Sequence, residues 1–520
     1  MRKFNITGNC IKAKHYMVDT SEKLEKIKAL VDDGAYFTIN RARQYGKTTT
    51  LYLLSDVLRS EYVCLKISFE GAGNIMFSSE QAFCNAFLKK LDLAITEEYP
   101  DSGIKWQNED VVDFSELNAH ISEICKNNKV VLLIDEVDKS SNNQIFLHFL
   151  GVLRSKYLAR NGSGYSTFHS VILAGVHDVK NIKLKMITSG THTASDGEGI
   201  YNSPWNIASD FDVDMSFNPV EIETMLTDYE SEHAIGMDKT EIAQEIYGYT
   251  GGYPYLVSNL CKIIDEKLNK NWTKNGVQEA VKIILEEKST LFDDLFKNLE
   301  NNPELSELIY NMVIIGNEYP FNFYTPNINT GVMYGIFKKS NTRKAVISNQ
   351  IFEMFITEYF VGKDLQSNGK NQRVTPNDVI NNGRFNMETC LKKFTHHYYE
   401  LFNESDIQFL ERHGRLLFLS YLKPLINGTG FYHIETETRN SRRMDIILDY
   451  NREQFIIEMK LWHGEKYKEK AYEQLLEYMS AKNIDTGYLL TFDFRTDANK
   501  ERQAEWIDFD NGRRIFDVVV

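Results

Sequence analysis

Residues 40–50 of the chain read NRARQYGKTTT and lie between a short apolar segment and a leucine-rich one. Their second half, Gly46-Lys47-Thr48, matches the end of the phosphate-binding pattern G-x-x-x-x-G-K-[ST], although Arg41 takes the place of the first glycine. A phosphate cradle needs inward-pointing backbone N–H groups at a helix N-terminus, a lysine for the outer phosphates and a hydroxyl for magnesium. The stretch therefore predicts a nucleotide site that uses these three residues.

A second motif strengthens this prediction. Residues 130–136 read VVLLIDE, an apolar strand pattern that ends in two acids. In a phosphate-loop fold this end of the strand faces the nucleotide, so Asp135 is expected at the magnesium ion and Glu136 at the attacking water. Acids also occur by chance at exposed strand ends, but their combination with the upstream Gly-Lys-Thr favours the nucleotide site. Arg41 and Arg43 either add positive charge to the cradle or are exposed loop residues.

The composition sets the class of protein. The chain has 520 residues, a net charge of −14 and six widely spaced cysteines. At roughly 150 residues per domain, this length predicts three to four domains. No apolar run approaches the roughly 18 residues of a membrane span, and no signal peptide is recognisable. We therefore expect a cytoplasmic protein with reduced thiols, no zinc site and no membrane partner, whose contacts with nucleic acid depend on local basic patches.

The first third of the chain alternates strand and helix patterns. This alternation predicts a parallel sheet covered by helices. Strands are expected at residues 36–39, 63–69, 130–134 and 171–176, and helices at 48–58 and 114–125. Residues 216–290 are almost wholly helical in pattern, and the order of patterns in residues 300–362, with a short strand at 344–348, suits a winged-helix unit. Residues 364–376 are polar and contain glycine, which predicts a linker.

Four segments together resemble one family. They are MVDT at residues 17–20, RARQYGKT at 41–48, LIDEVD at 133–138 and GYP at 252–254. The set resembles the AAA-ATPase-like family of bacterial proteins, related to the signal-transduction ATPases with numerous domains. The resemblance implies a helical lid and a winged helix after the core, and it makes Arg41 a mark of the family. Residues 252–254, which physics alone would explain as a turn before a helix that begins with proline, are then expected near the adenine.

The same resemblance implies the residues of the nucleotide site. We expect ATP to contact Arg43, Gln44, Tyr45, Gly46, Lys47, Thr48, Thr49, Asp135 and Pro254. Thr48 and Asp135 are expected to hold Mg²⁺, and Glu136 is the expected catalytic residue for hydrolysis. His177 stands where such ATPases place a polar sensor, although a simple loop histidine explains it better.

A third motif lies in residues 445–460, DIILDYNREQFIIEMK. Asp445 opens an apolar strand, a turn is predicted at residues 449–451, and a second strand follows at 455–460. This hairpin would bring Asp445 near Glu458 and would place Glu458 and Lys460 on one face. Two carboxylates and a lysine can bind magnesium and activate a water for phosphodiester attack. Taken alone, the same pattern also occurs by chance on solvated hairpins.

The surroundings of this hairpin resemble the PD-(D/E)XK nuclease superfamily, in the branch commonly fused behind AAA-ATPase-like domains. Glu437 stands eight residues before Asp445, and Gln474 follows in a helical pattern. The resemblance implies that Asp445 and Glu458 hold Mg²⁺ or Mn²⁺ and that Glu437 is an accessory metal ligand. Lys460 would position or deprotonate the water, and Gln474 would support the site from its helix.

We therefore predict an α/β protein with a P-loop NTPase parallel sheet, a helical lid, a winged helix and a restriction-endonuclease-like α/β domain. The expected boundaries are 1–215, 216–295, 296–363 and 376–520. The expected function is an ATP-binding and hydrolysing regulator coupled to magnesium-dependent cleavage of nucleic acid, DNA rather than RNA, with a homo-oligomer as one route of activation. Analogy with related fusions suggests defence against phage or mobile elements. The alternative is a signalling or scaffolding ATPase whose nuclease-like domain only binds nucleic acid or a protein.

Overall fold

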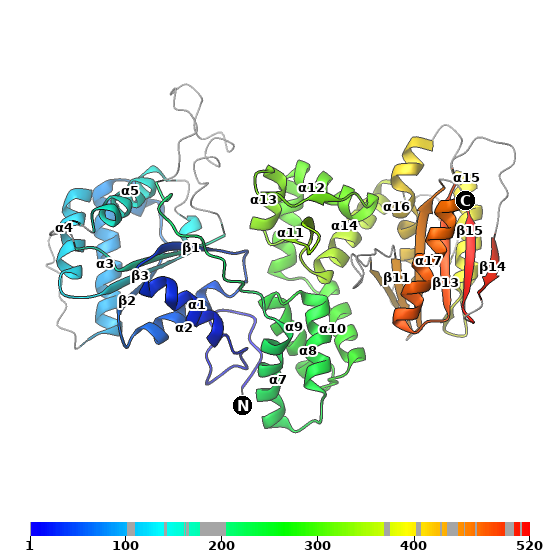
Figure 1. Ribbon diagram of the computed structural model, residues 1–520, viewed down its shortest axis with the longest axis horizontal. Coiled ribbons are helices and arrows are strands. Elements are labelled where there is room, and N and C mark those ends of the chain that lie inside the picture. Colours follow the sequence, from blue (N-terminus) through cyan, green and yellow to red (C-terminus); the bar gives the residue numbers. More distant parts are fainter. Residues whose placement is uncertain are drawn as a thin grey trace. The chain divides into compact units, whose positions relative to one another are not determined.

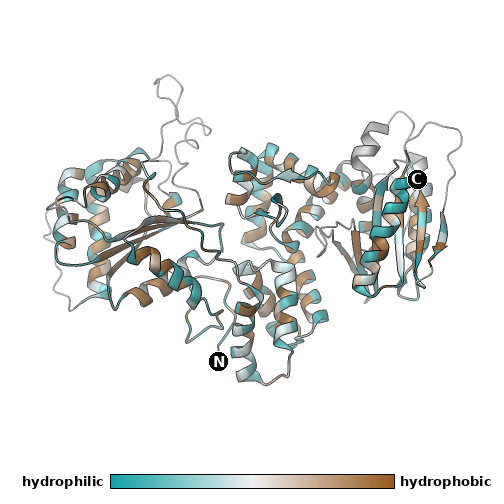
Figure 2. Cartoon of the chain, in the orientation of Figure 1, coloured by the Kyte–Doolittle hydropathy of each residue, from teal (hydrophilic) through white to brown (hydrophobic). Residues whose placement is uncertain are grey.

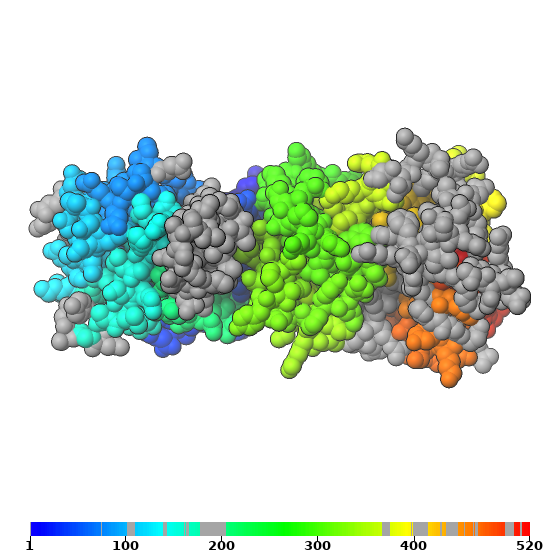
Figure 3. Space-filling model, turned by 90° about the horizontal axis from the view of Figure 1, so that it is seen from above, coloured from blue at the N-terminus to red at the C-terminus, as the bar shows by residue number. Residues whose placement is uncertain are grey.

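The structure is a computed structural model that describes most of the chain. The described residues are 2–100, 110–139, 143–160, 162, 166–176, 204–368, 375–401, 407–426, 429–433, 446–451, 453–462, 465–493, 504–509 and 512–520; the others are drawn in grey (Figures 1 and 3). His177, Glu437 and Asp445 lie outside these ranges. The chain forms two compact units, Met1–Ala280 with Met333–Gly335, and Val281–Val332 with Ile336–Val520.

The first unit contains a parallel sheet, as predicted. Its strands are β1 (Tyr36–Asn40), β2 (Val63–Ser68), β3 (Val130–Asp135) and β4 (Ser170–Gly175). They pair in the order β1-β4-β3-β2, with β1 and β3 both parallel to β4. A single parallel bridge between Phe37 and Ser209 lies on β1. The carboxyl ends of the strands therefore meet at one edge, where the loops after β1 and β3 lie.

Both faces of this sheet are buried by helices. Val130, Leu132 and Ile134 of β3 pack in one core with α3 (Glu80–Glu98), α4 (Phe114–Cys125) and α5 (Gln144–Ala159). The alternate residues, Val131 and Leu133, pack in a second core with α1 (Ser21–Asp32) and α2 (Lys47–Leu58) (Figure 1). Because side chains alternate between two covered faces, the strands are continuously apolar, which Figure 2 shows in brown.

Four helices complete the first unit. They are α7 (Pro219–His233), α8 (Lys239–Thr250), α9 (Pro254–Glu266) and α10 (Lys274–Glu286), whose residues 281–286 belong to the second unit. Their N-termini follow from the sequence: Asn218 and Glu221 form a capping box on α7, and Pro254 is the first residue of α9. Gly251 and Gly252 both adopt positive φ and separate α8 from α9. These helices account for the predicted helical character of the segment.

The second unit begins with helices and a small antiparallel sheet. In order they are α11 (Thr290–Asn301), α12 (Pro303–Tyr310), a π-helical turn (Asn311–Ile315), β5 (Tyr319–Pro320), α13 (Pro326–Met333), β6 (Phe337–Lys339), β7 (Lys344–Ile347) and α14 (Gln350–Asn368). The sheet order is β5-β7-β6. The winged-helix interpretation of this segment stays a prediction. The predicted linker is wrong in its first part, because α14 continues to Asn368 and Asp364 accepts a hydrogen bond from Ser420 at 2.7 Å.

A six-stranded sheet forms the end of the second unit. Two short strands, β8 (Ile380–Asn381) and β9 (Arg384–Phe385), precede α15 (Met387–Leu401) and α16 (Ile407–Ile426). The sheet contains β10 (Gly430–His433), β11 (Ile446–Tyr450), β12 (Glu453–Leu461), β13 (Thr486–Phe492), β14 (Ala504–Asp508) and β15 (Arg514–Val519), with α17 (Glu465–Lys482) between β12 and β13. Its order is β10-β11-β12-β13-β15-β14. The first three strands are antiparallel, and β12, β13 and β15 are parallel.

The hairpin of β11 and β12 differs from the prediction at its turn. We expected the turn at residues 449–451, but β11 extends through Tyr450, and Asp449 pairs with Gln454. Tyr450 is buried, which keeps it in the strand, and Asn451 takes the positive φ of 47° at which the chain leaves it. Asparagine tolerates this conformation better than most residues. Among the helices of the described residues, none has the length and apolar composition needed to cross a bilayer.

Candidate functional site

The loop between β1 and α2 is built around two positive φ angles. Gln44 has φ 57°, and Gly46 has φ 76° and caps the N-terminus of α2. Lys47, the first residue of α2, turns its ammonium back onto the loop, where it donates to the carbonyl oxygens of Arg41 at 2.9 Å and Ala42 at 2.8 Å. The loop thus presents a helix N-terminus and a lysine from one short segment, as an anion site requires.

Lys47 is a buried cation near three acids. Burial lowers the pKa of its ammonium, and the charges of Asp138, Glu136 and Asp135 act in the opposite direction. The largest of these opposing effects comes from Asp138, which was not among the predicted site residues. Its carboxylate also accepts a hydrogen bond from the backbone N–H of Val176 at 2.6 Å. The loops after β3 and β4 are therefore connected beside the lysine.

The two acids after β3 differ in their surroundings. Asp135 is the buried last residue of the strand, and its carboxylate accepts a hydrogen bond from the backbone N–H of Glu136 at 2.9 Å. Glu136 has φ 55°, an uncommon angle for this residue type. Burial raises the pKa of the Glu136 carboxyl, and the charge of Asp135 raises it further. A carboxyl with a raised pKa is suited to accepting a proton from water.

A cavity of about 690 Å³ lies against this loop. Its polar wall contains residues 43–50 and Glu136, and Pro254 lines it from the start of α9. Apolar side chains line another part, namely Met17, Val18, Leu24, Met215, Phe217 and Met225. Ligand pockets typically measure about 300–1,000 Å³ and combine an apolar wall with a few polar groups. The cavity thus offers a basic, polar part and an apolar part to a ligand.

All but one of the predicted nucleotide-site residues line this cavity. Arg43, Gln44, Tyr45, Gly46, Lys47, Thr48, Thr49 and Pro254 line it together with the predicted catalytic Glu136. Asp135 does not, although it is hydrogen-bonded to Glu136. Pro254 also lies 4.0 Å from the position that a Cβ atom on Gly46 would occupy. Residues 252–254 therefore approach the phosphate loop directly.

Arg41 and Arg43 have different environments. The Arg41 guanidinium donates to the carbonyl oxygens of Asn40 and Val213, each at 2.8 Å, and lies 5.4 Å from the centre of the Phe211 ring. Arg41 therefore braces the loop against the segment that leads to α7. Arg43 is exposed and lines the cavity. Arg43 is thus both an exposed loop residue and a residue of the cavity wall, and its contribution of charge to a bound ligand stays a prediction.

Two tyrosines connect the loop to the helical part of the first unit. The Tyr253 hydroxyl donates to the carbonyl oxygen of Arg43, and the Tyr45 and Tyr253 rings meet edge to face with centres 4.6 Å apart. The Tyr45 hydroxyl also lies 2.8 Å from Oγ of Ser216. A change in the loop conformation on ligand binding would therefore be transmitted through these hydrogen bonds to the starts of helices α7 and α9.

The N-terminal segment forms a wall of the cavity that the sequence did not predict. Its lining residues are Asn5, Ile6, Gly8, Asn9 and Cys10. The backbone N–H of Cys10 donates to Thr49 Oγ1 at 3.3 Å, and Arg2 forms ion pairs with Asp228 and Glu232 of α7, each at 2.7 Å. Cys10 is half-buried, whereas the other five cysteines are buried. The mixed polar composition of this segment carries no pattern that would have revealed its role.

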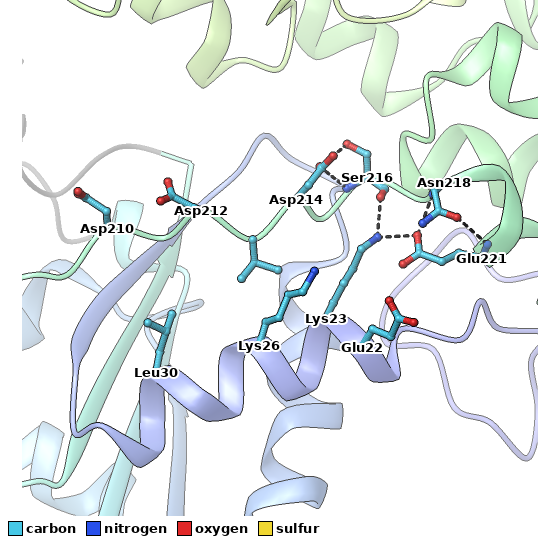
Figure 4. A pocket seen from close by; sticks show the side chains of 11 residues that line it. Glu22, Lys23, Lys26, Leu30, Asp210, Asp212, Asp214, Ser216, Asn218 and Glu221 are labelled. Carbon is cyan, nitrogen blue, oxygen red and sulfur yellow. Dashed lines mark hydrogen bonds and ion pairs between the residues drawn. The ribbon is translucent and has the colours of Figure 1, made fainter.

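A second cavity of about 510 Å³ lies beside α1 (Figure 4). Five carboxylates line it, namely Glu22, Asp210, Asp212, Asp214 and Glu221, against two lysines. One of these, Lys23, already donates to the Ser216 carbonyl at 2.6 Å and is paired with Glu221 at 2.7 Å. Excess negative charge disfavours phosphate here. The loop cavity is therefore the better nucleotide site.

The predicted nuclease residues are described only in part. Glu458 on β12 is 0% exposed, and its carboxylate is paired at 2.5 Å with the ammonium of Lys460, whose side chain is 37% exposed. Gln474 is half-buried on α17, and within the described parts of the chain no hydrogen bond joins it to this pair. Glu437 and Asp445 lie outside the described residues. Among the described residues, no group of three or more His, Cys, Asp or Glu side chains could hold a metal ion.

A second buried carboxylate lies in the same row of the sheet. Glu458 and Asp517 both pair with Leu489, one from each neighbouring strand, so the three residues share a face. Asp517 is fully buried, and its carboxylate accepts a hydrogen bond from Tyr472 and pairs with Lys468, both at 2.6 Å. Lys468 and Tyr472 both lie on α17, so their contacts with Asp517 fix this helix on the sheet.

Comparison with protein families assigns the part of the chain that contains the loop cavity. Residues 9–358 match the family described as AAA-like domain, which is more than half of the chain. The chain belongs to this family. The AAA-like match contains every predicted nucleotide-site residue, so an ATPase-like, nucleotide-binding domain follows from family and geometry alike. Residues 392–496 match a domain of unknown function (DUF8371), which contains Glu458, Lys460 and Gln474.

Comparison with solved structures gives weaker results for this AAA-like protein. It is similar to the Aeropyrum pernix ORC2 protein in its ADPNP–ADP complexes, with 11% identity, coverage of 68% of this chain and 96% of that chain, and a TM-score of 0.35. The ADP form of the same protein gives 11% identity, coverage of 66% and 90%, and a TM-score of 0.32. Scores this low support no conclusion about this chain. No curated protein matches its sequence.

Proposed function

We propose that the AAA-like part of this protein binds and hydrolyses ATP with Mg²⁺, and that its nucleotide state controls cleavage of nucleic acid by the C-terminal domain. The loop cavity supports the first half of this proposal. Lys47 and the N-terminus of α2 would bind the phosphates, and Pro254 with the apolar wall would contact the base. Glu136 would orient and deprotonate the attacking water, in keeping with its raised pKa.

The donor set of the loop fits magnesium. Mg²⁺ keeps several waters and needs only one or two carboxylates when phosphate oxygens complete its shell. Thr48 would supply a hydroxyl and Asp135 a carboxylate that lies at the end of β3. When bound, the ion would neutralise charge on the outer phosphates. The absence of a larger acidic cluster in the described residues is compatible with this site.

The nuclease half rests chiefly on the Glu458–Lys460 pair. A fully buried carboxylate paired with a lysine is costly to desolvate, and apolar residues in its place are often neutral or stabilising. Its presence on a central strand of the sheet therefore favours a chemical role. The order α16, β10, β11, β12, α17, β13 supports the proposed restriction-endonuclease-like fold. The strand register, which pairs Ile446 with Ile457, also supports a site at this end of the hairpin.

In this proposal, Glu458 would hold Mg²⁺ or Mn²⁺ together with Asp445 and Glu437, and Lys460 would orient or deprotonate a water. The metal, when bound, would supply charge neutralisation at the phosphodiester. We propose DNA as the preferred substrate, a cytoplasmic location in keeping with six free cysteines, and a homo-oligomer as the assembly that nucleotide binding would change. A bacterial anti-phage role is proposed only by analogy.

The test uses the purified full-length protein with labelled DNA and RNA, Mg²⁺ or Mn²⁺, and ATP present or absent. We expect wild-type protein to release phosphate from ATP and to cut nucleic acid. Lys47→Ala should abolish nucleotide binding, Glu136→Gln should retain binding without turnover, and Lys460→Ala should abolish cutting but not ATP turnover. Lys466→Ala, a change at an exposed lysine of α17, is the matched control for Lys460.

The outcomes separate the two halves of the proposal. Cutting that persists in Lys460→Ala means that the C-terminal domain is not the nuclease. Binding of nucleic acid without cutting in any metal favours the scaffolding ATPase. ATP turnover that persists in Glu136→Gln overturns the proposed role of this carboxylate and leaves the nuclease half untouched.

A further inference from the structure

One end of the small sheet in the second unit presents aromatic and basic side chains together. It consists of the loop after β5, residues 321–325, and the turn between β6 and β7 with the strand residues beside it, residues 338–344, which we call the aromatic–basic tip. The backbone N–H of Phe321 donates to the carbonyl oxygen of Arg343 at 2.9 Å, so the two segments are held side by side. The strands β5 and β6 both pair with β7, which fixes their order.

The loop of the tip exposes two large rings. Phe323 is 59% exposed and Tyr324 is 95% exposed. The loop is nevertheless ordered, because Asn322 accepts a hydrogen bond from the backbone N–H of Tyr324 at 2.9 Å and the Phe321 ring packs edge to face on Phe323 with centres 5.0 Å apart. Neighbouring rings that stay largely exposed on a fixed loop are typical of a binding surface.

The charge of this region is opposite to that of the whole chain. The chain has 59 basic and 73 acidic residues, but residues 308–352 contain four basic residues and a single acid, Glu318. That acid is already paired with Lys344 at 2.5 Å. The basic residues are Lys338, Lys339, Arg343 and Lys344, and the first three are exposed. The tip is therefore a local site for an anion on an otherwise acidic protein.

In the turn between β6 and β7, an arginine occupies a backbone conformation that is unfavourable for its residue type. Arg343 has φ 61°, in the left-handed region that glycine and asparagine adopt most easily. This region brings a Cβ atom close to the following carbonyl oxygen and is therefore unfavourable for arginine. The turn itself is held by Ser340, whose carbonyl accepts from the backbone N–H of Arg343 at 3.0 Å. An arginine in a conformation that disfavours it points to a role for its guanidinium rather than for the turn.

We propose that the aromatic–basic tip binds single-stranded nucleic acid, with phosphates on Lys339 and Arg343 and bases stacked on Phe323 and Tyr324. Exposed rings beside cations are the features that bind unpaired bases and their backbone. The helix α13, Pro326–Met333, carries no lysine or arginine, so it adds no charged phosphate contact to those of the tip. This inference deepens the proposed function by naming the form of its nucleic acid, and it does not require cleavage.

The test measures binding apart from cleavage. Full-length Lys460→Ala protein in EDTA is titrated against fluorescent oligo(dT), oligo(U) and a DNA duplex of equal length, and anisotropy is recorded over a range of salt concentrations. We expect single strands of DNA or RNA to bind more tightly than the duplex. Tyr324→Ala should weaken binding on the order of 10-fold, since a base stack is worth about 1–3 kcal/mol. The double change Lys339→Gln, Arg343→Asn should lower the salt slope by roughly 1.4, or about 0.7 for each phosphate contact.

The matched control is Phe296→Ala with Lys297→Gln, an exposed aromatic–basic pair on α11 of the same unit. It should bind as the parent does, and thermal melts should show that all variants are folded. Preference for the duplex, or binding unchanged by Tyr324→Ala, overturns the stacking proposal. An unchanged salt slope overturns the phosphate contacts. Because cutting is assayed separately with Lys460 intact, a protein that binds at the tip but never cuts would refute the nuclease and leave this inference standing.

Discussion

The Glu458–Lys460 pair allows a stability measurement that tests its role without any assay of cleavage. The changes are Lys460→Met, Glu458→Gln and both together. Removing one member of a fully buried pair costs about 3–5 kcal/mol, because the remaining charge is left without compensation. Here only the carboxylate is fully buried, and the Lys460 side chain is 37% exposed, so water can approach the vacated place. We therefore expect Lys460→Met to destabilise the domain by about 2 kcal/mol.

The double change should behave differently from the single ones. With both charges gone, no buried charge remains, and the expected effect on stability lies within about 1 kcal/mol of zero or is favourable. A double-mutant cycle then gives a coupling of roughly 1–3 kcal/mol between the two side chains. Such a result would mean that the pair is retained at a cost to stability, as expected of a site that performs chemistry.

Hydrogen–deuterium exchange of peptides that contain β12 and β13 gives the local free energy of opening, which avoids a two-state treatment of a chain with two units. Lys466→Met on α17 is the control and should leave exchange unchanged. The expected coupling is refuted if Lys460→Met is as stable as the wild type, or if the double change is destabilised by the sum of the single ones. The second result would mean that the two side chains contribute to stability independently, without a paired role.

Three further predictions concern the first unit. Gly252→Ala should lower the melting temperature and the ATP-induced stabilisation, because its Cβ would lie 2.0 Å from the Phe217 carbonyl oxygen at φ 75°; Gly248→Ala, with nothing within 4 Å, is the neutral control in the same thermal melts. The rate of phosphate release from ATP should fall as the pH drops through the raised pKa of Glu136, because the protonated carboxyl accepts no proton. The same acid-side decrease of the rate in Glu136→Gln would contradict this assignment. Burial lowers the pKa of His169, so the unfolded chain binds a proton at this histidine more readily than the folded chain does. The urea concentration at the unfolding midpoint should therefore decrease when the pH is lowered below about 6.5. His169→Phe should reduce this decrease, and an equal decrease in the variant would refute the assignment.

The phosphate loop and the sheet were predictable because their signals are local. Gly46, Lys47 and Thr48 are adjacent in sequence, and the strand patterns at β1 to β4 are continuous apolar runs of the kind that two covered faces require. The pairing of Glu458 with Lys460 followed from the two-residue period of a strand. Each of these features depends on neighbours in the chain.

Features that depend on distant segments could not be predicted. Cys10 meets Thr49 across 39 positions, and nothing in the polar N-terminal segment indicates that contact. Asp517 joins the row of Glu458 only through the order of β12, β13 and β15, which a single sequence does not specify. Arg41 was left open because its partner, the Val213 carbonyl, is a backbone group without a sequence signature. The turn after β11 was misplaced because burial of Tyr450 outweighed its local polar surroundings.

The distribution of the six thiols has a practical consequence for observing this protein. Five are buried, and Cys10 alone is half-buried and lines the cavity against the phosphate loop. A maleimide dye at limited excess would therefore attach mainly at one position of the unmodified sequence. Its emission would report the entry and departure of nucleotide in real time, and prior addition of ATP would slow the attachment. Cys10 thus offers one natural attachment point for a fluorophore beside the proposed nucleotide site.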